Sequence, residues 1–276
     1  MKYIITGSSG QLAKEFIKKF TELNIDFIAP SEQELDITNK EKISDVFSQF
    51  NPDVVINCAA YNNVELAEQD NTKAFLINKT AVTNLVEETK KYKAKLVHFS
   101  SDYVFDGKKK DFYIETDEPN PLNEYGKSKL AGEKEALKYD KSLVCRLSWV
   151  TGYGQQNFIY KLSGWLKNNK TVSVSEDEIS VPTFTFDIVN VIIKALDENL
   201  SGLYHLTNSG KASRYEVAKE FVKLSNLDNE LKPVLMASFD SKVQRPLFTA
   251  MSNKKISKEL NINIPDWKQS IRKFIS

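Results

Sequence analysis

Short apolar runs alternate with longer amphipathic segments over the first 150 residues of the chain. The apolar runs span residues 1–6, 27–29, 54–57, 96–100 and 143–147. Between them, apolar side chains recur at helical spacing in residues 12–23, 40–50, 72–92 and 124–139. Apolar strands that alternate with helices are typical of a parallel sheet covered on both faces. With right-handed crossovers, the pattern predicts an α/β fold with a doubly wound parallel sheet of Rossmann type.

A glycine-rich turn follows the first apolar run. The chain reads Gly-Ser-Ser-Gly-Gln-Leu-Ala from Gly7 to Ala13, and a helical pattern begins inside this stretch. In a strand–turn–helix unit of this kind, glycine lets a phosphate approach the backbone at the positive end of the helix. Gly7 and Gly10 therefore predict a site for the pyrophosphate of a dinucleotide, while an ordinary glycine turn remains the alternative.

Two further stretches carry groups that can move a proton. Ser100 and Ser101 follow the fourth apolar run, and Tyr125 and Lys129 lie four residues apart at the start of a helix, hence on one face. We expect the positive charge of Lys129 to lower the pKa of the Tyr125 phenol. Tyr125 can then protonate an alkoxide while the Ser101 hydroxyl holds the same oxygen, which is the equipment for carbonyl reduction.

The same Tyr/Lys spacing recurs at Tyr215 and Lys219. No serine-bearing strand end precedes this second pair, and it lies on a plain amphipathic helix. We interpret Tyr215 and Lys219 as structural.

The regular alternation of strands and helices stops near Thr151. We therefore expect residues 1–150 to form an NAD(P)-binding Rossmann domain. Residues 151–276 are expected to form a smaller C-terminal α/β region that binds substrate and is interleaved with the first domain. The chain has no internal repeat and no low-complexity tract.

Composition and charge narrow the class of protein. The 276 residues carry 38 basic and 37 acidic side chains, so the net charge of +1 gives no electrostatic case for a nucleic-acid partner or an anionic membrane. No apolar run approaches a membrane span, and no secretory signal pattern is present, so we expect a cytoplasmic protein. Cys58 and Cys145 are expected to be buried free thiols. His98 and His205 are isolated, and no Cys/His cluster has metal-ligand spacing, so we expect no metal site. The acidic run from Glu176 to Glu178 is interpreted as a solvated turn, and a divalent ion bound there at a subunit contact is the alternative.

Taken together, these stretches resemble the extended short-chain dehydrogenase/reductase family, and within it the dTDP-4-dehydrorhamnose reductases. The resemblance covers nearly the whole length. Its most specific carrier is the stretch Ser-Asp-Tyr-Val-Phe-Asp-Gly that ends at Gly107. The other carriers are the glycine turn, residues 34–38, 57–61, 67–68 and 125–129, residues 146–150, 157–158 and 182–183, and Arg245-Pro246.

The resemblance implies a role for individual residues. Tyr125 would be the proton donor, Ser101 would bind the carbonyl, and Lys129 would hold the nicotinamide ribose. Cofactor contacts are implied for Gly7, Gly10, Gln11, Leu12, Asp36, Ile37, Ala59, Ala60, Tyr61, Ser100, Tyr125 and Lys129. Substrate contacts are implied for Ser101, Asp102 and Trp149. The implied reaction is hydride transfer from NADPH or NADH to C4 of a nucleotide sugar, dTDP-4-dehydro-L-rhamnose, giving dTDP-L-rhamnose for polysaccharide synthesis.

Several positions depart from the family's usual residues. Glu178 and Ser180 stand where Gln and Gly are more usual, and Arg214 stands where Trp is more usual. Phe248-Thr249 replaces the usual Asn-Ser after Arg-Pro. These changes concern the substrate half of the chain, so they bear on the identity of the sugar more than on the reaction class.

Some interpretations stay open at the level of sequence. Trp149 fits stacking on a base or sugar and also fits core packing. Asp36 fits the adenine site and also fits an N-cap of the following helix.

Two alternative functions remain for the whole chain: a lyase or epimerase of the same superfamily, and a non-catalytic partner of methionine adenosyltransferase. Tyr103 stands where a dehydratase of this kind would need a Glu, and the intact Ser101, Tyr125 and Lys129 argue against a non-catalytic role. The choice between NADH and NADPH and the oligomeric state, a homodimer included, are left open.

Overall fold

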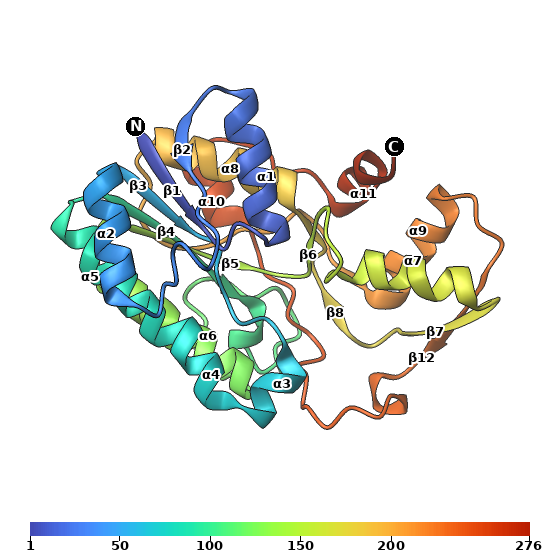
Figure 1. The fold of residues 1–276 in the computed structure, drawn as a ribbon. Coiled ribbons are helices and arrows are strands. Elements are labelled where there is room, and N and C mark those ends of the chain that lie inside the picture. The colour runs from blue at the N-terminus through green and yellow to red at the C-terminus, as the bar shows by residue number, and fades with distance from the viewer.

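A six-stranded parallel sheet forms the centre of the molecule (Figure 1). The computed structural model describes residues 1–276. In spatial order the strands are β10 (Gly202–His205), β5 (Ser142–Leu147), β4 (Lys95–Ser101), β3 (Val54–Asn57), β1 (Lys2–Thr6) and β2 (Asp26–Ile28). Every neighbouring pair is parallel, which confirms the predicted doubly wound sheet. The strand order reverses at β1, and folds of this kind bind ligands in the crevice at that point, outside the carboxyl ends of the strands.

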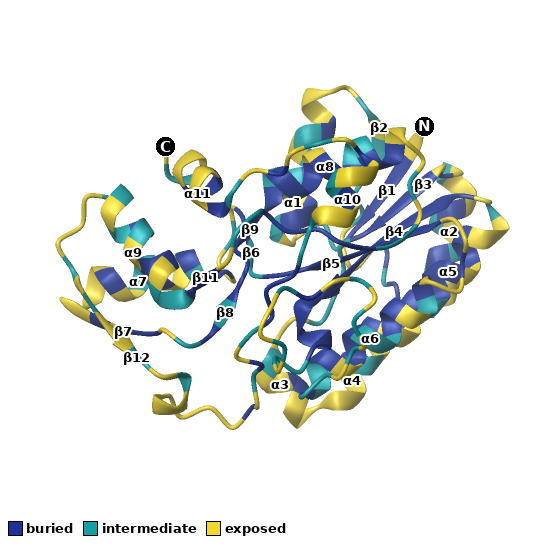
Figure 2. Cartoon of the chain, turned by 180° about the vertical axis from the view of Figure 1, so that it is seen from behind, coloured by how far each residue is buried: buried dark blue, intermediate teal, exposed yellow.

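Helices cover both faces of the sheet, and their buried sides face the strands (Figure 2). One face carries α1 (Gln11–Glu22), α8 (Thr185–Asp197) and α10 (Lys254–Glu259). The other carries α2 (Lys40–Phe50), α5 (Ala81–Lys91) and α6 (Glu124–Ala136). Helix α1 packs against the sheet because Leu12, Phe16 and Phe20 recur every four residues and are buried together.

The helix predicted over residues 72–92 contains one π-helical turn. After the short helix α3 (Val64–Gln69), it comprises α4 (Asn71–Phe75), the turn η1 (Leu76–Thr80) and α5. In that turn the buried Asn78 donates to the carbonyl of Tyr61 at 3.0 Å and to Oγ of Ser128 at 2.9 Å. A Cβ on Gly132 would lie 1.8 Å from the Asn78 carbonyl oxygen. Helix α6 can therefore approach the turn this closely only because residue 132 is glycine.

Most residues beyond 150 form a smaller unit beside the sheet, at the right of Figure 1. Its elements are β6 (Val150–Thr151), α7 (Phe158–Asn168), β7 (Thr171–Ser175), β8 (Ile179–Ser180), β9 (Thr183–Phe184), β11 (Ala212–Ser213), α9 (Arg214–Leu224), β12 (Glu230–Val234), η3 (Met236–Ser238) and α11 (Trp267–Ile275). Leu162, Phe184, Phe221 and Trp267 belong to a separate core there. Strand β10 and helix α8 also follow residue 150, but they join the main sheet and its cover. The domain boundary near residue 150 stays a prediction.

A buried ion pair ties α6 to the sheet. The Arg146 side chain of β5 reaches Glu133 of α6, with Nη2 2.6 Å from Oε1 and Nε 2.9 Å from Oε2. His205 of β10 contacts the same guanidinium at 3.2 Å, and burial followed by the charge of Arg146 lowers the pKa of His205 to about 3. Tyr125, Lys129 and Glu133 follow one another at intervals of four residues. The pair therefore fixes the helix face that carries Tyr125 and Lys129.

Glu133→Gln should destabilise the protein by about 3–5 kcal/mol, because it leaves the Arg146 guanidinium buried without a counter-charge. Urea unfolding measures the loss in the free energy of unfolding. Glu135→Gln is the matched control on the same helix, since Glu135 pairs with the exposed Lys138 at 2.7 Å. That variant should lose about 0–1 kcal/mol. Equal losses would show that the buried pair does not stabilise the fold.

Candidate active site

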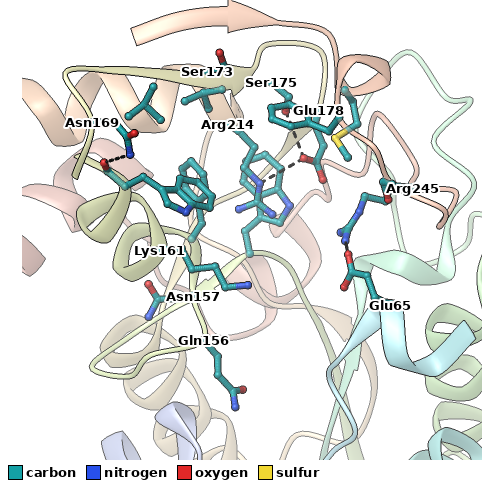
Figure 3. Close-up of a pocket in the computed structure, with 18 of the residues that line it drawn as sticks. Glu65, Gln156, Asn157, Lys161, Asn169, Ser173, Ser175, Glu178, Arg214 and Arg245 are labelled. Carbon is teal, nitrogen blue, oxygen red and sulfur yellow. Dashed lines mark hydrogen bonds and ion pairs between the residues drawn. The ribbon is translucent and has the colours of Figure 1, made fainter. Parts of the chain in front are cut away.

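Two cavities meet where the sheet faces the smaller unit. The first, of about 350 Å³, lies at the carboxyl ends of β1, β3 and β4. The second, of about 720 Å³, lies between α7, β7 and the segment that includes η3, and Figure 3 shows it in close-up. Both are lined by Trp149, Val150, Gln156, Arg214 and Arg245. Because they share these side chains, one extended ligand can occupy both cavities.

The glycine turn forms one wall of the smaller cavity. Gly7 has a φ of +66°, and a Cβ there would lie 2.7 Å from the backbone of Ala59. Gly10 is the N-cap of α1, and a Cβ there would meet only the Gly7 carbonyl oxygen, at 3.2 Å. Ser100 lines the same cavity, and its Oγ is buried without a hydrogen-bond partner. A helix N-terminus with room in front of it and an unpaired hydroxyl nearby fit the pyrophosphate and ribose of a dinucleotide.

Most of the predicted site residues line the smaller cavity together. These are Gly10, Gln11, Leu12, Ala59, Ala60, Ser100, Ser101, Asp102, Tyr125, Lys129 and Trp149. Four predicted cofactor contacts do not line it, namely Gly7, Asp36, Ile37 and Tyr61.

Apart from Gly7, which belongs to the glycine turn described above, these residues contact other parts of the protein. Ile37 is 6% exposed and belongs to the core beside α2. The backbone of Tyr61 is held by Asn78. Asp36 accepts from the backbone N–H of Thr38 at 2.9 Å. The alternative role of Asp36 as the N-cap was wrong, because Asn39 caps α2 by accepting from two backbone N–H groups of its first turn.

Ser101, Tyr125 and Lys129 come from β4 and from the start of α6. Burial raises the pKa of Tyr125 to about 12, and the Ser101 side chain acts in the opposite direction by hydrogen bonding. The Lys129 ammonium donates to the Phe99 carbonyl at 2.6 Å, and burial lowers its pKa to about 8. The expected lowering of the Tyr125 pKa is therefore not found, because burial outweighs any effect of the lysine. At neutral pH the phenol keeps its proton, which is the form that a proton donor needs.

Asp102 is a buried carboxylate between the two halves of the chain. It begins the short turn η2 (Asp102–Val104) after β4 and is 3% exposed. Oδ1 accepts from Ser101 at 3.2 Å, and Oδ2 accepts from Ser180 at 2.9 Å and Thr249 at 2.5 Å. Burial raises the pKa of Asp102 to about 6, although the three hydroxyls and the charge of Arg214 act against the rise. Asp102 borders the cavity where a sugar contact was expected, but hydroxyls already surround its oxygens.

Trp149 is held in an unusual conformation at the junction of the cavities. Its φ is +39°, in the left-handed region that favours glycine. The Arg214 guanidinium carbon lies 3.5 Å from the centre of the indole ring, and the indole is partly buried against the core of the smaller unit. Since Arg214 covers one ring face, a ligand can stack only on the other.

Sequence reasoning left the cationic side chains of the larger cavity without a role. Arg245 donates to the Tyr103 hydroxyl at 2.9 Å and pairs with Glu65, while Arg214 pairs with Glu178 at 3.6 Å (Figure 3). Lys161 lines the same cavity. Arg214 and Glu178 had both been noted as departures from the family pattern. Only the pairing of β8 with β11 brings them together, and two-residue strands leave no periodic signal in a sequence.

The structure contains no group of three or more His, Cys, Asp or Glu side chains placed to hold a metal ion. None of its helices combines the length and the apolar character that crossing a membrane requires.

Known proteins match this chain over almost its whole length. The family described as RmlD substrate binding domain matches residues 1–276. The spore coat polysaccharide biosynthesis protein SpsK of Bacillus subtilis is 32% identical over 275 residues, which cover 99% of this chain and 96% of that protein. The dTDP-4-dehydrorhamnose reductase of Aggregatibacter actinomycetemcomitans is 32% identical over an aligned length of 290 residues, covering 98% and 97%. The crystal structure of dTDP-4-dehydrorhamnose reductase from Bacillus anthracis in complex with NADP has a TM-score of 0.96 and 31% identity, covering 99% of this chain and 98% of that one.

Asp102→Asn should change the way stability depends on pH. The folded-state pKa of about 6 lies above the ordinary value of 3.8, so the folded protein binds this proton more tightly than the unfolded chain does. The resulting stability is fully present below about pH 4 and is lost as the pH rises through about 6. The free energy of unfolding of the wild type, minus that of Asp102→Asn, should therefore fall by up to about 3 kcal/mol over that range. Urea unfolding at a series of pH values measures it.

Asp106→Asn is the control of opposite sign. Burial raises the pKa of Asp106, but hydrogen bonds from Lys108, Asn120 and Tyr113 outweigh burial and leave the pKa lowered. The corresponding difference for Asp106 should fall on acidification instead. A difference for Asp102→Asn that does not vary with pH would contradict the raised pKa.

Proposed function

The chain belongs to the RmlD substrate binding domain family, and we propose that it is an NAD(P)H-dependent oxidoreductase that reduces the C4 ketone of dTDP-4-dehydro-L-rhamnose to give dTDP-L-rhamnose. The observation that carries the proposal is the full-length match, at about one third identity, to a protein named for this reductase activity. The cavity that joins the glycine turn to Ser101, Tyr125 and Lys129 supports it. A similar chain was solved in complex with NADP, which supports a nicotinamide dinucleotide as the cofactor.

In this proposal Ser101, Tyr125, Lys129 and the glycine turn have separate roles in the smaller cavity. The Ser101 hydroxyl binds the oxygen of the C4 ketone, and the protonated Tyr125 donates its proton to that oxygen as the alcohol forms. Lys129, fixed by the Phe99 carbonyl, binds the ribose next to the nicotinamide. The glycine turn and the N-terminus of α1 bind the pyrophosphate. The cofactor, when bound, supplies the hydride, and the protein supplies position and polarity.

The larger cavity suits the nucleotide part of the substrate. It lies next to the smaller cavity and carries polar and cationic side chains beside apolar ones. A substrate whose ketone lies at Tyr125 extends past Trp149 into this space.

The residues of this site argue against the alternative functions. A dehydratase of this superfamily would need a carboxylate at Tyr103, whose hydroxyl instead accepts a hydrogen bond from Arg245. A non-catalytic subunit would not need Ser101, Tyr125 and Lys129 around one cavity. Absorbance assays with dTDP-4-dehydro-L-rhamnose and each reduced cofactor test the proposal directly. Oxidation of NADPH or NADH that depends on this sugar is expected, and its absence with both cofactors would refute the proposed activity.

Tyr125→Phe should lower kcat by about 10²-fold or more, because the ring remains while the proton donor is removed. The dissociation constant for NADPH, measured by fluorescence titration, should change little. Tyr215→Phe is the matched control, since Tyr215 has the same spacing to a lysine but packs in the smaller unit. Turnover by Tyr125→Phe at the rate of the control would exclude Tyr125 as the donor.

Gly10→Val should abolish measurable binding of NADPH while leaving the fold intact. The substitution puts a branched side chain where a phosphate must approach the backbone, but the only nearby atom is the Gly7 carbonyl oxygen, at 3.2 Å from a Cβ. Fluorescence titration measures binding, and circular dichroism measures the fold. An unchanged affinity would mean that the pyrophosphate binds elsewhere.

A further inference from the structure

Two cationic side chains, Arg214 and Arg245, line both cavities. Arg245 already donates to the Tyr103 hydroxyl and pairs with Glu65, whereas the proposed function gives Arg214 no role. It is the first residue of α9, and its backbone N–H donates to the Glu178 carbonyl at 3.2 Å. The pairing of β11 with β8 directly before it fixes the point from which the side chain starts. The guanidinium therefore has a defined position although it lies far in sequence from the glycine turn and from Tyr125.

Two aromatic rings contact the Arg214 guanidinium at this junction. Its central carbon lies 3.5 Å from the centre of the Trp149 ring and 4.9 Å from that of Phe158. Contacts with ring faces orient a guanidinium without using its N–H donors, which point outward in the plane of the group. The side chain is 19% exposed. Arginine at this site is thus both fixed and able to bind a further partner.

The donors of Arg214 are not consumed by the protein. Its single ion pair joins Nε to Oε2 of Glu178 at 3.6 Å, which is longer than a hydrogen bond. Its side-chain nitrogens make no hydrogen bond within the protein, and none of them is buried. They are therefore reachable from the cavities that Arg214 lines. A guanidinium with accessible donors in a fixed fork matches the oxygens of a phosphate group.

The charge of the larger cavity also favours an anion. Its lining has three cationic side chains, Lys161, Arg214 and Arg245, and two anionic ones, Glu65 and Glu178. Each glutamate pairs with one arginine, and one positive charge remains in excess (Figure 3). Figure 3 shows Lys161 on the same side of the cavity as Arg214.

We propose that Arg214 binds the diphosphate of the nucleotide sugar and thereby selects diphosphate-linked sugars over uncharged ones. In such a substrate the diphosphate joins the sugar to the nucleoside. With the sugar beside Ser101 and Tyr125 in the smaller cavity and the nucleoside in the larger one, the diphosphate lies at their junction. Trp149 and Phe158 act on the substrate through Arg214, by holding its guanidinium in the orientation that meets the phosphate oxygens. This inference rests on the proposed function, because it assumes the ketone at Tyr125.

The test compares two ligands that differ only in the diphosphate, dTDP and thymidine, and it does not depend on turnover. Arg214→Met keeps an unbranched side chain and removes the charge. It should raise the dissociation constant for dTDP about 10- to 100-fold, the equivalent of a lost charged hydrogen bond or two. Binding of thymidine and of NADPH should stay close to wild type. Isothermal titration calorimetry measures all three, and in kinetics the Michaelis constant for the sugar nucleotide should rise much more than kcat falls.

Arg272→Met is the matched control, because Arg272 is an exposed arginine on α11 that pairs with Glu220 at 3.5 Å, outside both cavities. It should bind dTDP as the wild type does. If Arg214→Met does not fold, Arg214→Lys keeps the charge without the fork, and a selective loss of dTDP affinity is expected there too.

The outcomes separate this inference from the proposed function. If the wild type reduces the sugar and binds dTDP, but Arg214→Met binds dTDP equally well, the role of Arg214 is refuted and the function stands. If Arg214→Met loses affinity for NADPH instead of dTDP, Arg214 belongs to the cofactor site and the inference is again refuted. If the wild type neither binds dTDP nor uses the sugar, the proposed function fails and the inference fails with it.

Discussion

The buried pair between Arg146 and Glu133 is the contact on which the geometry of the site depends. A charge buried inside a protein needs a counter-charge beside it, so each partner of the pair holds the other in place. Here one partner lies on strand β5 of the sheet, next to the edge strand β10, and the other lies on α6, eight residues beyond Tyr125. Two close approaches support the same helix, since a Cβ on Gly126 would lie 2.2 Å from the Tyr103 carbonyl oxygen and Gly132 meets Asn78. Helix α6 therefore has little freedom to slide or rotate, and the distance from Tyr125 to Ser101 is set by the core and not by a loop.

A second constraint joins the sheet to the smaller unit. The Asp102 carboxylate accepts hydrogen bonds from the hydroxyls of Ser101, Ser180 and Thr249, which belong to three separate parts of the chain. Ser180 and Thr249 also bond to each other at 2.9 Å. Because β8 carries Ser180 and pairs with the strand before Arg214, the network links the reacting end of the site to the part that meets the nucleotide. A network of this kind acts as one unit, since each polar group depends on the others for its partners.

The sequence was sufficient for five of the six strands of the sheet and insufficient for the sixth and for the contacts across the sheet. The strands and helices of the first 150 residues follow from periodicity because each buries one apolar face along its length. The strand β10 is short, and nothing in its four residues indicates that it returns to the edge of the sheet. The π-helical turn at Asn78 was not predictable either, because its five residues lie within a regular helical pattern.

The candidate site divides in a similar way. The glycine turn and the residues at the end of β4 were predictable because the carboxyl ends of parallel strands converge. The raised pKa of Tyr125 was not predictable, because it depends on burial by residues distant in sequence. Ser180, Thr249 and Arg214 appeared only as departures from a pattern, and in the structure they are neighbours of Asp102 and Trp149.

The left-handed backbone of Trp149 has a consequence for protein engineering. A side chain other than glycine in a sparsely populated region costs on the order of 1–3 kcal/mol. Glycine or asparagine at position 149 would relieve this strain but would lose the packing of the indole against the smaller unit and its contact with Arg214, so a library selected for heat resistance alone weighs the backbone against the side chain at this one position.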